Sequence, residues 1–234
     1  MHNYVFYSFL ILLVVFSLFG CGDKENKTTE PPINTDELLS GSEWIIVLGG
    51  AEDYENSEST DAYSIIYNSE NLPPEEKVEL EINGISYELF LDDDYNTYQF
   101  SFADTVALQF ETGHNYHIIF KIGGVNQAEY NLKMVGYAQL RSIETFNSAE
   151  DCLFEWTLDD NPMVQYFIGE SPDNIQSLLG TFGPSQREFT YKGGTLEYQS
   201  GYYEFGIVYA NYATVNNVKF ISMFSSWIDC YQDK

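Results

Sequence analysis

The sequence contains few basic residues. Its 234 residues include 10 lysines and arginines against 36 aspartates and glutamates, so the formal net charge is −26 at pH 7. Nucleic acids and anionic lipid headgroups would be repelled by this charge, and we expect neither as a partner. The acid excess favours solubility and attracts cations. A solvated acidic surface without a specific ligand explains it as well.

Catalytic motifs are also missing. The chain has no G-x-S-x-G nucleophile elbow and no glycine-rich phosphate loop. Adjacent carboxylates, as at Glu75–Glu76 and Asp159–Asp160, are so numerous that none stands out as the acid and base of a glycosidase. We therefore expect a non-enzymatic protein without a cofactor.

Only three cysteines are present, and the first ends an apolar run. The uncharged segment Tyr4–Phe19 has the length of the hydrophobic region of an export signal, whereas a membrane-spanning helix usually needs about 20 residues. Leu18-Phe19-Gly20-Cys21 resembles the lipobox of bacterial lipoproteins. The resemblance implies that residues 1–20 are a signal peptide, that the Cys21 thiol is lipidated, and that acyl chains hold the protein on a membrane. An uncleaved membrane anchor with an incidental cysteine is the alternative.

Residues 21–41 are polar and rich in Thr, Asn, Glu and Pro, so they are expected to form a disordered tether. Gly22, not Asp, follows the cysteine, so the inner-membrane retention signal known from enteric bacteria is absent. The acidic patch Asp23–Glu25 resembles the surface-export signals of some bacterial lipoproteins. We expect an outer-membrane lipoprotein of the bacterial cell envelope, with surface exposure left open.

The remainder favours an all-β fold. The whole chain has 19 Tyr and 17 Phe, which suit half-buried strands, and short alternating runs are separated by turn residues. Two tandem β-sandwiches are expected, over residues 42–135 and 136–234. In the first, Val78–Leu89 alternates around Asn83-Gly84, which predicts a hairpin with a type I′ turn. Tyr98–Phe102 is predicted to be the next antiparallel strand, and Glu43–Leu48 the first strand of the domain.

Both halves carry motifs of known sandwich families. Phe110 stands six residues before Tyr116, which resembles the tyrosine corner of immunoglobulin-like domains, where the hydroxyl bonds to nearby backbone. The second half is similar to a fibronectin type III domain, with Trp156 in strand B and Tyr166 in strand C. The similarity implies that Tyr203, Phe205, Ile207 and Tyr209 face inward from strand F, that Asn211 ends this strand, and that Val218–Trp227 is strand G. A fold is implied, and no activity.

In this fold, the start of strand B, where Cys152 lies, and the end of strand G, where Cys230 lies, are at the same end of the sandwich. An exported compartment is oxidising, so a disulfide between them is expected. Closing a loop of this length would stabilise the domain by about 4 kcal/mol in the chain-entropy model. Two unpaired thiols are the alternative.

Two weaker metal motifs are present. Asp92, Asp94 and Asn96 place oxygen side chains at alternate positions, as calcium loops do, but the downstream glutamate and the glycine of such loops are missing. A solvated hairpin turn explains them equally well. His114 and His117 enter a predicted strand, where residues i and i+3 point to opposite faces, so a shared metal is not expected.

Two functions fit these features. The first is a surface module for binding or adhesion, in which sandwich loops or exposed aromatics such as Tyr202 and Tyr212 contact protein or carbohydrate. The second is a structural spacer or assembly subunit of an envelope complex, without a ligand site of its own. A planar row of exposed rings would favour a glycan, and an apolar patch of several hundred Å² would favour a protein partner.

Overall fold

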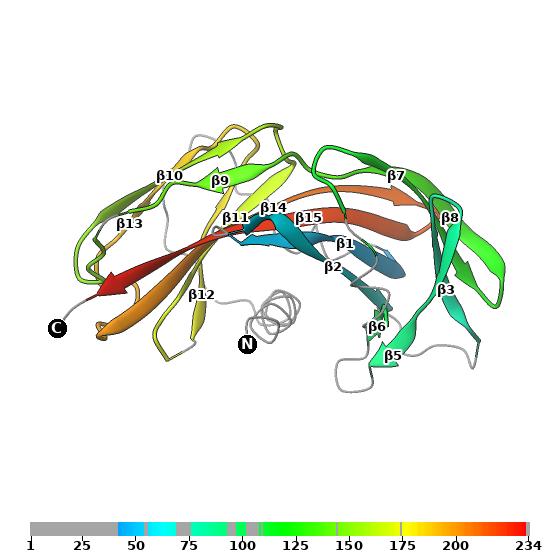
Figure 1. Ribbon diagram of the computed structural model, residues 1–234, viewed down its shortest axis with the longest axis horizontal. Helices are drawn as coiled ribbons and strands as arrows, with labels where there is room; N and C mark the ends of the chain where they lie inside the picture. The colour runs from blue at the N-terminus through cyan, green and yellow to red at the C-terminus, as the bar shows by residue number, and fades with distance from the viewer. Residues whose placement is uncertain are drawn as a thin grey trace.

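A computed structural model of the chain is shown in Figure 1. It describes residues 42–53, 56–68, 76–92, 97–101, 108, 110–143, 145–173 and 175–232. These residues form fifteen strands in three sheets, and they contain no helix. The eight-stranded sheet has the order β12 (Gln176–Phe182), β11 (Val164–Glu170), β14 (Gly201–Val215), β15 (Val218–Gln232), β1 (Trp44–Asp53), β2 (Asn56–Asn68), β6 (Thr97–Gln99) and β5 (Phe90–Asp92). The three-stranded sheet has the order β13 (Glu188–Tyr191), β10 (Cys152–Leu158) and β9 (Ala138–Leu140). The four-stranded sheet has the order β4 (Ile85–Glu88), β3 (Val78–Ile82), β7 (Asn115–Ile122) and β8 (Val125–Lys133).

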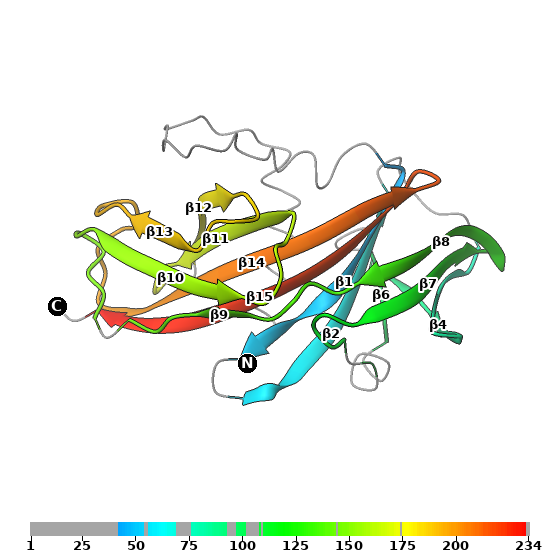
Figure 2. The same ribbon diagram turned by 90° about the horizontal axis from the view of Figure 1, so that it is seen from above.

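The expected all-β class and its two successive sandwich layers are present. The three-stranded and four-stranded sheets lie on the same side of the eight-stranded sheet, one at each end (Figures 1 and 2). The long strands β14 and β15 run beneath both small sheets (Figure 2). A single large sheet therefore serves as the second layer of both sandwiches.

The large sheet is continuous because β1 pairs in parallel with β15 over nine residue pairs, from Trp44↔Val218 to Glu52↔Ser226. The segment between β8 and β9 contains the expected domain boundary, and it is part of the core rather than a solvated linker. Val135 and Ala138 are buried, and the Ala138 N–H donates to the Tyr209 hydroxyl at 3.2 Å. The two halves of the chain thus share backbone pairing and side-chain packing.

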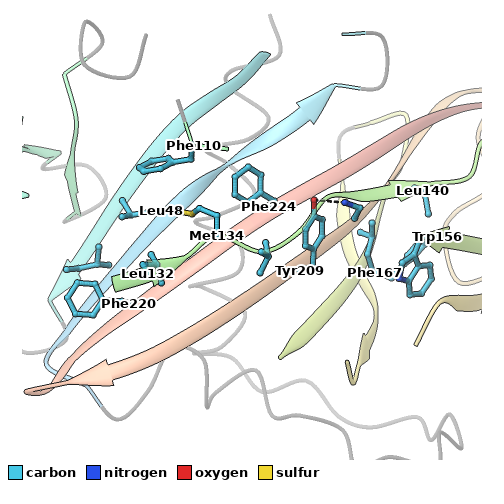
Figure 3. Packing of buried hydrophobic residues seen from close by; sticks show 14 of the residues in the cluster. Leu48, Phe110, Leu132, Met134, Leu140, Trp156, Phe167, Tyr209, Phe220 and Phe224 are labelled. Atoms are coloured by element: carbon cyan, nitrogen blue, oxygen red, sulfur yellow. Dashed lines mark hydrogen bonds between the residues drawn. The ribbon is translucent and has the colours of Figure 1, made fainter. Parts of the chain in front are cut away.

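One hydrophobic core lies between the large sheet and the two small ones. Figure 3 shows its side chains from both halves, with Leu48, Met134 and Phe224 toward one end and Phe167 and Trp156 toward the other. Aromatic rings dominate the end beneath the three-stranded sheet. The side chains of Phe146, Phe154, Phe167, Tyr191 and Tyr203 surround Phe205 at centroid distances of 4.5 to 6.5 Å.

The β3–β4 hairpin forms as predicted. Val78, Leu80 and Ile82 are buried while Glu79 and Glu81 are less so, which is the alternation that fixes the register of a half-buried strand. Asn83 and Gly84 both have positive φ, at 51° and 84°, as the type I′ turn requires.

Two predictions about strands were wrong. Tyr98 does not continue the β3–β4 sheet: β6 pairs with β5 and β2 in the eight-stranded sheet, because the chain crosses between layers at the buried Leu89. The strand with Tyr203 does not end at Asn211 but continues to Val215. Asn211 fits inside the strand because its Oδ1 accepts a hydrogen bond from the Met163 N–H at 2.9 Å.

Both tyrosine corners are formed. The Tyr116 hydroxyl accepts from the Glu111 N–H at 2.9 Å while its ring packs edge-on against Phe110. The Tyr203 hydroxyl donates to the Glu197 carbonyl at 2.6 Å and accepts from the Gln199 N–H at 2.9 Å. The seven-residue spacing from Leu196 is therefore compatible with a corner. As the similarity implied, Tyr203, Phe205, Ile207 and Tyr209 are all buried in the core.

Replacing Tyr203 by Phe is expected to lower the free energy of unfolding by about 1–2 kcal/mol, because two backbone groups lose a buried partner. Tyr116→Phe is the matched control and should cost less, since its hydroxyl bond is exposed to solvent. Urea denaturation of both variants measures the difference. Equal losses would show that the Tyr203 corner contributes nothing beyond an exposed one.

Candidate functional site

Several predicted site residues lie outside the described residues. These are Cys21 with the whole lipobox, and Asp94 and Asn96 of the possible calcium loop. Asp92 is the last residue of β5, and only its backbone is described. The lipid anchor and the calcium site remain predictions.

Cys152 and Cys230 lie in facing layers of the same sandwich, and both are free thiols. Burial raises the pKa of Cys230 to about 12, and the nearby Cys152 and Asp229 add to the rise. Burial also raises the pKa of Cys152, which is only half-buried. Cys152 packs against the core cluster to which Cys230 belongs. Their disulfide stays a prediction.

These thiols should differ in reactivity. In the folded, reduced protein at pH 8, iodoacetamide is expected to label Cys152 first, because both burial and a raised pKa suppress the Cys230 thiolate. In urea the two rates should converge. Above about pH 9 the unfolded state releases the Cys230 proton before the folded state does, so stability should fall as pH rises. Peptide mass spectrometry follows the labelling, and faster reaction of Cys230 in the folded protein would contradict its burial.

The two histidines contact different carboxylates. His114 Nδ1 lies 3.2 Å from Glu111, and His117 Nε2 lies 2.8 Å from Glu129 on the neighbouring strand. Among the described residues, no group of three His, Cys, Asp or Glu side chains is arranged to hold a metal ion.

The remaining candidate is the outer face of the eight-stranded sheet, the face opposite the two small sheets. Side chains alternate along each strand, so this face receives every second residue of β1, β11, β14 and β15. A second apolar cluster, separate from the core, forms its centre, with Tyr212 and Trp227 packed at its edge. The cluster consists of Ile45, Val47, Val164, Tyr166, Ile168, Val208, Ala210, Ile221 and Met223.

Two buried hydroxyls of this face have no hydrogen-bond partner, Tyr166 Oη and Ser225 Oγ. They flank the same residue, because Val208 pairs with Tyr166 on β11 and with Ser225 on β15. A buried hydroxyl without a partner costs about 1–3 kcal/mol of stability. At the far end of the face, the Lys219 ammonium lies 5.4 Å from the centre of the Tyr212 ring.

Exposed aromatic side chains gather at the other end, nearest the C-terminus. Tyr202 and Tyr231 are cross-strand partners, 65% and 52% exposed, with ring centroids 5.0 Å apart and ring planes tilted by 59°. The next pair inward on the same face is Glu204 and Asp229. We call these four residues the aromatic patch. Beyond them the Trp227 indole lies over Gly206, where an added Cβ would meet the ring at 2.5 Å.

The sequence pointed to only part of this site. Tyr202 was predicted to be exposed, and it is, whereas Tyr212 is half-buried. Tyr231 and Asp229 were missed, although Trp227, Asp229 and Tyr231 alternate with buried residues on one strand. The Asn216-Asn217 turn, with φ of 49° and 62°, would have aligned them with Tyr202 and Glu204.

The fold and this site define an all-β sandwich protein whose large sheet carries a buried apolar cluster on its outer face and an exposed tyrosine pair at one end of that face. No protein-family model matches the chain, and no curated protein does. Among solved structures, it is similar to the tetra-tandem repeat in the extending region of a large adhesion protein, with 8% sequence identity and a TM-score of 0.27. The match covers 81% of this chain and 49% of that one, so the chain spans about half the length of that structure. Within the described residues, no helix has the length and apolar character to cross a membrane.

Proposed function

We propose that this protein is a lipid-anchored binding or adhesion module of the bacterial cell envelope, and that the exposed end of the outer face of its large sheet, at Tyr202 and Tyr231, holds a protein ligand. The observation that supports this most is the exposed Tyr202–Tyr231 pair at the end of an apolar sheet face. Tyrosines of this kind bind well because each offers a large apolar ring and a polar hydroxyl at low entropic cost.

A protein ligand suits this face better than a glycan. The two exposed rings are tilted by 59° and do not form a flat platform for stacking sugar rings. Leu178 and Asp229, which are exposed on the same face, offer one apolar and one polar contact of the kind that protein interfaces use.

The lipid anchor belongs to the same proposal. A thioether-linked lipid at Cys21, followed by the polar residues 22–41, would leave the two sandwich layers free to reach a partner beyond the membrane. Incorporation of radiolabelled palmitate into the wild-type protein, but not into Cys21→Ser, tests the anchor. Protease shaving of whole cells then tests whether the C-terminal half is displayed at the surface.

The binding role is tested with cells that carry the wild-type chain or the double variant Tyr202→Ala/Tyr231→Ala. Adhesion of each strain to an array of immobilised extracellular proteins and glycans is compared with that of cells lacking the protein. Leu153→Ala is the matched control, because Leu153 is 49% exposed but lies on the three-stranded sheet. We expect adhesion to protein spots that the double variant loses and the control keeps. Adhesion that all three chains share, or no adhesion at all, would contradict the proposal.

The spacer function has one observation in its favour, which is the continuous sheet that runs through both sandwich layers. A spacer would carry a partner on other surfaces and would not need Tyr202 or Tyr231. Its expected result is therefore unchanged behaviour of the double variant in the adhesion experiment.

A further inference from the structure

The aromatic patch has the chemistry of a site for an organic cation. The faces of an aromatic ring are negative, so a cation above a tyrosine is attracted to it. Tyr202 and Tyr231 are neighbours across β14 and β15, and their tilted rings present two faces that are not parallel. Such a pair suits a compact positive group in contact with both rings.

Carboxylates complete the arrangement. Glu204 and Asp229 are directly opposite each other, and Glu170 is opposite Glu204 on β11. Like charges at opposed positions of neighbouring strands destabilise a sheet. None of the ion pairs formed by the described residues includes Asp229, which is exposed. Glu170 is buried and accepts a hydrogen bond from the Gln176 amide, so Asp229 is the exposed carboxylate of this row. It places negative charge two residues from Tyr231, about 7 Å along the strand.

The chain supplies no cation to this end of the outer face from the strands that form it. Lys219, on the same face of β15, is ten residues from Asp229, which is about 33 Å in an extended strand. Its ammonium lies over Tyr212 instead. The described strands of the large sheet thus place no lysine or arginine at the aromatic patch, and the net charge of −26 would draw a basic partner toward the protein.

We propose that the aromatic patch binds an arginine or lysine side chain of the protein ligand, placed against Tyr202 and Tyr231 and paired with Asp229. This inference rests on the proposed function and gives the ligand its chemistry: an aliphatic surface that ends in a basic residue. The aliphatic part covers Trp227 and the exposed Leu178, which pairs with Ile168 on the same face. The basic residue then fixes the orientation of the ligand along the sheet.

The test isolates the cation from the rest of the ligand. N-acetyl-arginine methylamide and its neutral isostere, N-acetyl-citrulline methylamide, are titrated into the purified protein at 20 mM NaCl, and the ring-proton signals of Tyr202 and Tyr231 are followed by NMR. Two ring contacts and a carboxylate favour the arginine compound about tenfold in Kd. The preference should weaken with added salt, because Asp229 is exposed.

Variants separate the contributions. Tyr202→Ala and Asp229→Asn should each weaken binding of the arginine compound several-fold, whereas Tyr202→Phe should retain it, since the ring face and not the hydroxyl contacts the cation. Tyr198→Ala and Glu150→Gln are the controls, because both residues are exposed and lie outside the aromatic patch. Circular dichroism of each variant verifies that it is folded.

Three results would overturn the inference: equal affinity for the arginine and citrulline compounds, no shift of the tyrosine signals, or an affinity for the arginine compound that Tyr202→Ala leaves unchanged. None of these results contradicts the proposed function if cells that carry the Tyr202→Ala/Tyr231→Ala variant lose adhesion. In that case the outer face binds a ligand whose contact at the aromatic patch is uncharged. If the double variant adheres normally, the proposed function fails, whatever the titration shows.

Discussion

A chain that ends at Val135 is expected to lose the stable fold of residues 42–135. β1 would be left without β15, its parallel partner over nine residue pairs, and Trp44, Leu132 and Met134 would lose the core contributed by β14 and β15. The complementary fragment, residues 136–234, would expose the long edge of β15 and is expected to self-associate. Circular dichroism and size-exclusion chromatography of the two fragments measure both effects.

Mixing the two fragments is the control for this prediction. If the loss of structure comes from the missing β1–β15 pairing, the mixture should recover the circular dichroism of the whole chain. Two fragments that each unfold cooperatively alone, with midpoints matching those in the whole chain, would show that the shared sheet contributes nothing to stability.

The second large effect is expected from Phe205→Ala, which should lower the free energy of unfolding by about 3–5 kcal/mol. Phe205 is fully buried at the centre of the aromatic part of the core, with ring centroids of Phe154 and Phe146 at 4.5 and 4.7 Å. The cavity would be bounded by rigid rings from both sheets, which have little freedom to close it.

Tyr202→Ala, three residues earlier on the same strand, is the matched control for the loss of a large ring. Because Tyr202 is exposed, its replacement should change stability by no more than about 0.5 kcal/mol. Urea denaturation of the two variants gives the comparison. A loss below about 1 kcal/mol for Phe205→Ala would mean that the rings repack around the gap.

Features with local causes could be predicted from the sequence. The β3–β4 hairpin follows from alternation around Asn83-Gly84, whose two positive φ angles few other residue pairs adopt. The two tyrosine corners follow from short spacings, since Tyr116 and Tyr203 bond to backbone within six residues. In both cases the interacting residues are close in sequence, so a short sequence motif is enough to predict the structure.

The shared sheet depends on pairing between the two ends of the described chain, which no local pattern specifies. A signal for it existed in Trp44–Leu48, where every residue is apolar and no alternation is present. Ile45 and Val47 belong to the outer-face cluster while Trp44, Ile46 and Leu48 belong to the core. A strand that is apolar on both faces is typical of the interior of a sheet with a parallel neighbour.

In the candidate site, too, local features could be predicted from the sequence and features that depend on strand pairing could not. Composition and an exposed tyrosine indicated a binding surface, but the aromatic patch exists only because Val215 pairs with Val218 and thereby aligns Tyr202 with Tyr231, thirteen pairs further along. Tyr166 illustrates the limit of the similarity to fibronectin type III domains. It lies in β11 as expected, yet it faces the outer surface, and its neighbour Phe167 packs in the core.

The central claim is that one sheet unites both sandwich layers. Hydrogen exchange of the whole protein at increasing urea, read by mass spectrometry in peptides from β7 and from β10, tests it most directly. The account predicts that both strands lose protection at one shared urea midpoint, because β14 and β15 lie beneath both small sheets. Separate midpoints, with β7 exchanging while β10 remains protected or the reverse, would contradict it.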